Sequence, residues 1–170
     1  MERMWVFDHL AVAVARTDFF DPAVAGTPDG RERGVRIEIR PARWSSDGTI
    51  YVSDAVGLDP AFCRIDFLES APGAADRMHW HPSMPGGEPG DRTFERAMPP
   101  DPVGWLKAFL TDLGSYLERA DGADAAAMAG DLDAVEAASD DIAAAVADGL
   151  AWAREPWPDA VHDERGRASA

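Results

Sequence analysis

The sequence predicts an α+β domain, with an antiparallel sheet of about four to six strands first and two or three helices after it. Its first half contains short segments in which apolar and polar residues alternate, as they do in half-buried strands. Its second half contains apolar residues spaced three and four apart, as they are on one face of a helix. Strands followed by helices favour helices packed on one face of an antiparallel sheet.

The first strands are expected in residues 5–15 and 35–40. The run "WVFDHLAVAVA" (5–15) is apolar and rich in valine, which predicts one strand buried on both faces, with a short helix as the alternative. The segment "DPAVAGTPDGRERG" (21–34) is rich in glycine and proline and predicts a loop. In "VRIEIR" (35–40) the aliphatic residues alternate with charged ones, so the aliphatic side chains face inward.

Three more strands are expected before the helices. A turn at "SSDG" leads into "TIYVSDAV" (49–56). The segments "FCRIDFLE" (62–69) and "RMHWH" (77–81) both alternate and lie on either side of the turn "SAPGAAD" (70–76). These two segments therefore predict a β-hairpin.

The first helix is expected in residues 101–122. Asp101 is a typical N-cap, Pro102 suits the first turn, and Gly122 can end the helix. The helix has one broad apolar stripe, made of Trp105, Leu106, Phe109, Leu110, Leu113, Tyr116 and Leu117.

Residues 123–154 are rich in alanine and predict one or two further helices. Ser139, followed by two aspartates, could cap a fresh helix, so both readings stay open. Pro156 ends the helical region. We expect one α+β domain over residues 1–157 and a polar, frayed tail over 158–170.

The charge of the chain limits its partners. Its 170 residues carry a net charge of −15, with 31 acidic against 16 basic residues. This disfavours binding to nucleic acid or to an anionic membrane surface, and it leaves room for a basic partner. No apolar run approaches the roughly 20 residues that span a bilayer. We expect a cytoplasmic protein with Cys63 as a buried thiol.

The expected hairpin has a register that its apolar residues select. If Ile65 lies opposite Trp80, then Cys63, Ile65 and Phe67 share one face with Met78 and Trp80. A slip of one residue would set apolar against charged side chains. The other face then carries five polar residues, which are Arg64, Asp66, Arg77, His79 and His81.

Two histidines in an H-x-H pattern on a strand point the same way, about 7 Å apart at the backbone. His79 and His81 could therefore bind one metal, with Glu88 as the nearest third ligand along the chain and Asp76 or Asp91 as substitutes. Asp66, across the hairpin, could hold the far nitrogen of His79. Such a site with open positions would suit iron, manganese or zinc.

The segment "RIDFLESAPGAADRMHWHP" resembles the first metal motif of the cupins. In that motif a glycine, five residues and H-x-H precede a glutamate, and Gly73, His79 and His81 match this spacing. Glu88 lies further from His81 than the motif has it, and no second histidine motif follows. The resemblance covers about 20 residues, and we assign no family from it.

Two other readings of this face remain open. Arg64 and Arg77 would repel a cation and attract a carboxylate or phosphate, so the face, with Asp66, could instead bind a small anionic ligand. It could also be the solvated side of a half-exposed sheet. The pattern does not separate catalysis from binding. His9, within an apolar segment, predicts a hydrogen-bonded core histidine, and His162 an exposed one in the tail.

Acidic residues in the second half suggest an alternative function. Residues 121–155 contain nine acidic residues and one basic residue. Such a surface could dock a basic protein, as inhibitor or immunity proteins do, or it could be an ordinary solvated helix face. We therefore expect a small-molecule or divalent-metal binding protein with its site at His79 and His81, and a non-enzymatic acidic binding module as the alternative.

Overall fold

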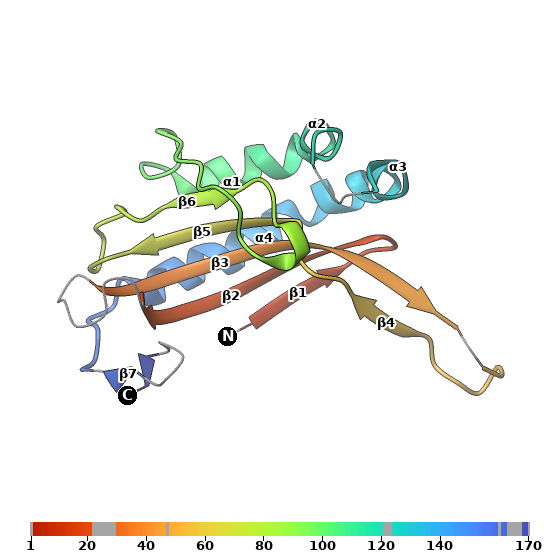
Figure 1. The fold of residues 1–170 in the computed structure, drawn as a ribbon, viewed down its shortest axis with the longest axis horizontal. Coiled ribbons are helices and arrows are strands. Elements are labelled where there is room, and N and C mark those ends of the chain that lie inside the picture. The colour runs from red at the N-terminus through yellow and green to blue at the C-terminus, as the bar shows by residue number, and fades with distance from the viewer. Residues whose placement is uncertain are drawn as a thin grey trace.

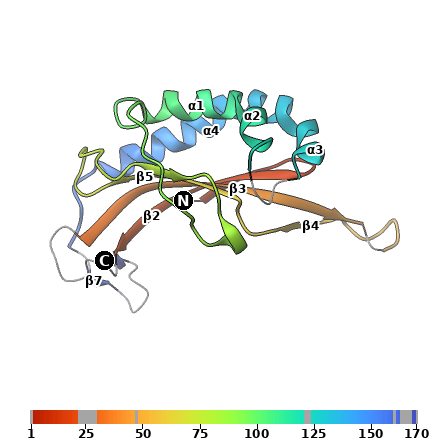
Figure 2. The same ribbon diagram turned by 45° about the horizontal axis from the view of Figure 1, so that its top comes forward.

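The fold is α+β, as predicted: an antiparallel sheet in the N-terminal half is followed by helices that cover one of its faces (Figure 1 and Figure 2). The computed structural model describes residues 2–21, 30–46, 48–120 and 124–159, and the backbone of 161–162 and 168–169. No helix within these residues is both long and apolar enough to cross a membrane.

The main sheet has the strand order β1-β2-β3-β5-β6, and β4 pairs with the far end of β3. Its strands are β1 (Glu2–Val6), β2 (Leu10–Phe20), β3 (Arg31–Ser45), β4 (Ala55–Leu58), β5 (Cys63–Glu69) and β6 (His79–His81). The helices are η3 (Pro85–Gly87), α1 (Pro102–Thr111), α2 (Leu113–Leu117), α3 (Ala125–Met128), η4 (Ala129–Asp131) and α4 (Leu132–Ala153). Near the C-terminus, β7 (Val161–His162) pairs with β8 (Ala168–Ser169).

The N-terminal apolar run forms two strands and not one. The chain turns between β1 and β2, where the amide of Phe7 donates to the carbonyl of Leu10 (2.8 Å), and Trp5 pairs with Val12. The polar residues Asp8 and His9 occupy this turn. The run is apolar beyond the turn because every residue from Leu10 to Val14 is buried.

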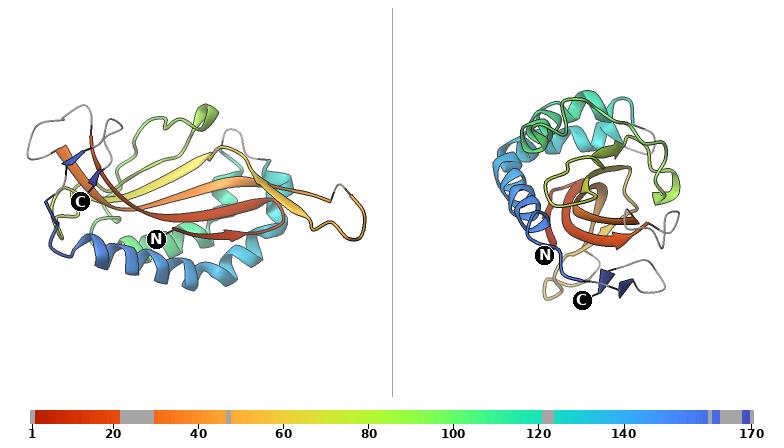
Figure 3. Two further views of the ribbon diagram at one scale, coloured as in Figure 1. Left: turned by 90° about the horizontal axis from the view of Figure 1, so that it is seen from below. Right: turned by 90° about the vertical axis from the view of Figure 1, so that its left-hand side faces the viewer.

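Strand β3 is longer than "VRIEIR" predicts, although the predicted inward residues Val35, Ile37 and Ile39 are fully buried. It begins at Arg31, in a segment expected to be a loop, and continues to Ser45. Its far end and β4 form an arm that extends beyond the helices (Figure 3). The strand predicted over residues 49–56 is mostly wrong, because Ile50 and Tyr51 lie in the exposed turn of this arm.

The helices follow the predicted apolar pattern with different boundaries. Asp101 caps α1, as predicted, by accepting from the amide of Gly104 (2.9 Å). The helix expected over 101–122 breaks at Asp112 into α1 and α2. Residue 122 lies outside the described residues. Ser139 caps no helix, because α4 runs through it without interruption and ends before Pro156.

The core lies between the helices and the sheet face that they cover. Cys63 is fully buried there, as predicted, and burial raises the pKa of its thiol to about 12. The members of the core include Leu10, Val12, Val35, Ile37, Ile39, Ile65, Phe67, Leu106, Leu110, Leu113, Val135, Ile142, Val146 and Leu150.

One buried carboxylate ties the first hairpin to the helical layer. Asp131, directly before α4, accepts hydrogen bonds from the backbone amides of His9 (2.7 Å) and Leu10 (2.9 Å) through one oxygen. The prediction that His9 lies in the core is wrong, because its side chain is half exposed and only approaches Asp131 at 3.7 Å. The backbone amides of His9 and Leu10 are thus hydrogen-bonded to Asp131, whereas the imidazole ring of His9 lies at the surface.

We expect Asp131→Ala to lower the free energy of unfolding by about 2–4 kcal/mol, because it leaves two backbone amides without their acceptor. Urea denaturation would measure the loss. Asp133→Ala is the matched control, since Asp133 is exposed in the first turn of α4. Equal losses in the two variants would contradict this role for Asp131.

Candidate metal centre

The hairpin of β5 and β6 has the predicted register. Ile65 lies opposite Trp80, Asp66 opposite His79, and Arg64 opposite His81. The Trp80 ring packs on the helix side of the sheet. Its centroid lies 5.6–6.1 Å from the ring centroids of Trp105, Phe109 and Tyr116. Trp80 is only partly buried, but it lies on the face of the sheet on which it was predicted to lie. His79 and His81 therefore share the opposite face of the sheet.

That face is not the solvated surface that the sequence left open as a reading. His79 is 4% and His81 5% exposed, because the chain after β6 folds back over them. It leaves the sheet at Pro82 and returns at Thr93, which exchanges two backbone hydrogen bonds with Trp80 (2.8 and 3.0 Å). Figure 3 shows this segment on the opposite side of the sheet from the helices. The two histidines are thus buried under a loop.

Backbone carbonyls orient both imidazole rings. Nδ1 of His79 lies 2.9 Å from the carbonyl oxygen of Arg77, and Nδ1 of His81 lies 2.8 Å from that of Gly90. A carbonyl can only accept, so each Nδ1 carries the proton and donates it. In the neutral rings each Nε2 then has a free lone pair. This is the arrangement that metal-binding histidines use.

The two Nε2 atoms meet at one carboxylate. They lie 3.7 Å (His79) and 3.8 Å (His81) from Oδ2 of Asp66, which is too long for a hydrogen bond. One ligand atom from each of the three residues lies within 4.8 Å of the others, so the group could hold a metal ion. Ligand atoms on one tetrahedral zinc are about 3.4 Å apart. The two distances to Asp66 exceed this value by only a few tenths of an ångström.

The neighbours of Asp66 and His79 favour metal binding, because they fix the carboxylate and keep the imidazole neutral. Asp66 is 2% exposed and accepts from Nε of Arg36 (2.7 Å), which fixes its carboxylate. Burial lowers the pKa of His79, and the charges of Arg92 and His81 lower it further, against the opposing effects of the Arg77 carbonyl and Asp66. The ring is therefore neutral near pH 7, which is the form that binds metals.

The other predicted site residues lie in different places. Arg64 lines the same face, where its guanidinium binds Glu38 (2.8 Å). Arg77 contributes its carbonyl to His79, while its side chain is not part of the pocket lining and lies 3.7 Å from Asp76. Glu88 is exposed and does not belong to the group that could hold a metal; its place is taken by Asp66.

A pocket of about 290 Å³ lies beside the three residues. Strands β2, β3, β5 and β6 form its floor, and the segment after β6 forms one wall with Pro89, Gly90 and Arg92. The backbone carbonyl of Gly90 in this segment contacts His81. The carboxylates of Glu88 and Asp91, which were expected to reach the histidines, are exposed outside the pocket.

The pocket residues that sequence reasoning missed include Glu32, Arg36 and Arg92. Glu32 lay in a segment predicted to be a loop, and Arg36 was expected to face water. Extending the alternation of "VRIEIR" back through Gly34 to Glu32 would have put Glu32 and Arg36 on one face. For Arg92 no comparable signal exists, because it follows an irregular loop.

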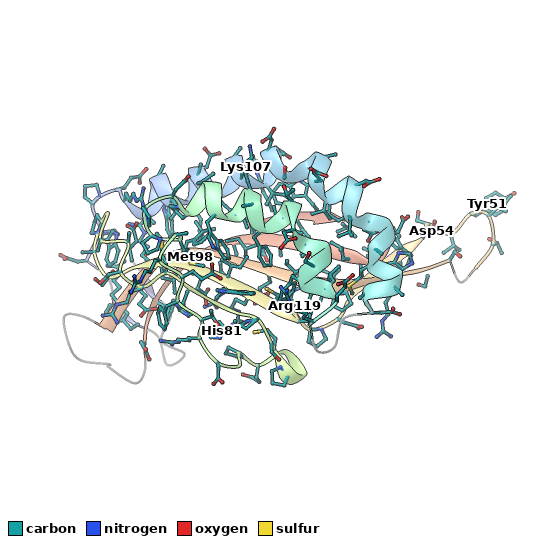
Figure 4. The ribbon with its side chains drawn as sticks, turned by 90° about the horizontal axis from the view of Figure 1, so that it is seen from above. Tyr51, Asp54, His81, Met98, Lys107 and Arg119 are labelled. Carbon is teal, nitrogen blue, oxygen red and sulfur yellow. The ribbon has the colours of Figure 1, made fainter. Side chains whose placement is uncertain are left out.

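The acidic helices contain no comparable group within the described residues. Their exposed carboxylates include Asp140, which binds Lys107, and Asp141, which accepts from the indole of Trp5 (3.1 Å). Lys107 and His81 lie on different sides of the molecule (Figure 4). The side chain of His162 lies outside the described residues.

Comparison with known proteins adds no assignment: no family model, no curated protein and no solved structure matches the chain. The geometry of the pocket and its charged residues are therefore the basis for a proposed function.

We expect Glu32→Gln to raise the melting temperature by several degrees near pH 7 and to leave it unchanged near pH 4. Burial raises the pKa of Glu32 above its ordinary value of 4.5. The folded chain then keeps this proton longer than the unfolded chain, so the free energy of unfolding falls as pH rises through the raised pKa. Glutamine has no charge to bury and escapes this loss.

Thermal denaturation between pH 4 and pH 8 would measure the effect. Glu118→Gln is the control, since Glu118 is exposed at the end of α2. A gain from Glu32→Gln that is the same at every pH would contradict the ionisation argument.

Proposed function

We propose that the protein binds a divalent transition metal through Asp66, His79 and His81, and that a small molecule reaches the metal from the adjacent pocket. The observation that carries this proposal is the convergence of two Nε2 lone pairs on one buried carboxylate. Two imidazoles and a carboxylate leave coordination positions open and suit iron, manganese or zinc. A metal with open positions can polarise a bound oxygen or activate a water molecule, so the site suits catalysis as well as binding.

Two of the three arginines that line the pocket are paired with carboxylates, Arg36 with Asp66 and Arg64 with Glu38. The third, Arg92, lies on the segment after β6, and its charge acts on His79. Hydrogen bonds from Arg40 and Arg64 outweigh the effect of burial and lower the pKa of Glu38, which therefore stays ionised. Repulsion from Arg64, which argued for an anion site from the sequence, is thus largely offset by its carboxylate partner.

The acidic helices remain the basis of the alternative, a docking surface for a basic protein. Asp148 and Glu136 are exposed on α4, but Asp140 and Asp141 are engaged within the chain. No observation favours this surface over an ordinary solvated helix face.

Adding Mn²⁺, Fe²⁺, Co²⁺, Ni²⁺ or Zn²⁺ near neutral pH should raise the melting temperature of the protein. A ligand at a hundredfold excess over its dissociation constant stabilises the native state by about 2.7 kcal/mol. For a chain of this size that corresponds to roughly 5–10 °C. The double change His79→Ala with His81→Ala should abolish the gain, with circular dichroism confirming that the variant is folded.

The carboxylate ligand is decided by a pair of conservative variants. Asp66→Asn should remove most of the metal-induced gain, and Glu88→Gln should leave it in place. The reverse result would assign the third ligand to Glu88, as the spacing along the chain suggested. A wild-type protein that no metal stabilises would refute the proposed function.

Gly90→Ala should weaken metal binding about tenfold without touching a ligand, because the partners that orient a metal-bound histidine are worth about 10–100-fold in affinity. A Cβ on Gly90 would lie 2.7 Å from the carbonyl oxygen of Ser83, so the segment must shift and carry its own carbonyl away from His81. Metal titration by calorimetry would measure the affinity. Gly130→Ala is the control, since its Cβ would meet no atom within 4 Å, and equal affinities in both variants would contradict the positioning role.

A further inference from the structure

Glu32 is a buried carboxylate in the pocket wall that has no partner of its own. It is 6% exposed and lines the pocket beside the two histidines. No hydrogen bond or ion pair to its carboxylate is found in the part of the chain that the structure describes. Buried carboxylates are normally paired, because removing their charge from water is costly. The carboxylate oxygens of Glu32 are not among the fully buried polar atoms without a partner, so they are accessible in the pocket and can accept a donor from a ligand.

The charges around Glu32 act from a distance. Arg77 and Arg92 attract its carboxylate, and Asp21 and Asp66 repel it. Burial is nevertheless the largest influence, and the pKa of Glu32 is raised. The surrounding arginines therefore do not replace a direct partner.

Ionisable groups line the pocket at two places, Leu68 lies between them along the sheet, and the charge of Arg92 acts on both. Asp66, His79 and His81 lie at one place and Glu32 at the other. Between Glu32 and Arg36 on β3 stands Gly34, where a Cβ would lie 2.0 Å from the Phe67 carbonyl oxygen, so no larger residue fits. Gly34 pairs with Leu68, whose side chain lines this middle part.

We propose that the pocket binds a small zwitterionic substrate, with its carboxylate at the Asp66, His79 and His81 group and its ammonium group at Glu32. This inference rests on the proposed metal function, since the metal supplies the position for the substrate carboxylate. A hydrogen bond between an ammonium group and a carboxylate is stronger than one between neutral groups. It would give the Glu32 carboxylate a donor, which no described residue of the chain supplies.

The length of the substrate follows from the strand. Glu32 and Arg36 are four residues apart on β3, which is about 13 Å of backbone. Asp66 is the register partner of Arg36 on the neighbouring strand. The backbone at Asp66 is therefore also about 13 Å from the backbone at Glu32 along the strand direction, and the side chains shorten this gap. The space that remains suits an aliphatic chain of a few carbon atoms, with Leu68 and Phe19 against it.

The test is a matched series of ligands on the Co²⁺-loaded protein, with affinities measured by calorimetry. The ω-amino carboxylates of three to six carbons are compared with the unsubstituted carboxylates and the ω-hydroxy carboxylates of the same lengths. At one length the amino compound should bind at least tenfold more tightly than both counterparts. Glu32→Gln should remove that preference and leave the affinity of the unsubstituted carboxylate unchanged.

Each failure has a distinct cause. If Co²⁺ itself does not bind, the proposed metal function fails. If Co²⁺ binds but no amino compound is preferred, or the preference survives Glu32→Gln, the zwitterion inference is overturned and the metal site stands. Equal binding of the hydroxy and amino compounds would also overturn it, because Glu32 would then accept from a neutral donor. Glu118→Gln, remote from the pocket, should keep the full preference.

Discussion

The geometry of the candidate site depends on the pairing of Ile65 with Trp80. That pair lies on the helix side of the hairpin, where the Trp80 ring packs among the aromatic residues of α1 and α2. Successive residues of a strand point to opposite faces, so packing on one side fixes the other side as well. A register shift of one residue would turn His79 into the core and Trp80 into the pocket. The aromatic packing therefore positions residues with which it has no contact.

The same constraint runs across three strands. Arg36 of β3, Asp66 of β5 and His79 of β6 lie in one row, because each is the register partner of the next. The row places a cation, a carboxylate and an imidazole in sequence. The Gly90 carbonyl then fixes His81 from the segment above the sheet. The helix side of the sheet thus carries the apolar core, and the opposite side gathers ionisable groups under a loop.

Local periodicity predicted the fold class, the hairpin register and the shared face of Asp66, His79 and His81. It could not predict that His79 and His81 are buried, because their cover is an irregular segment that alternation does not describe. The search for a third ligand along the chain led to Glu88, whereas the carboxylate that lies beside the histidines is across the hairpin. Glu32 was missed because glycine and proline in residues 21–34 suggested a loop. Sequence patterns describe single strands well and contacts between distant segments poorly.

The contact of Asp131 with the first hairpin also bears on how the chain folds. The hairpin of β1 and β2 is local and can form early, but its amides at His9 and Leu10 obtain their acceptor from a residue more than 120 positions away. Contacts of such high sequence separation form late, because closing the intervening chain costs entropy. During synthesis the first hairpin would leave the ribosome long before Asp131 and wait with this turn unsatisfied. The turn between β1 and β2 can therefore be completed only after Asp131 and α4 have been synthesised and packed. The sheet and the helical layer should then become stable together.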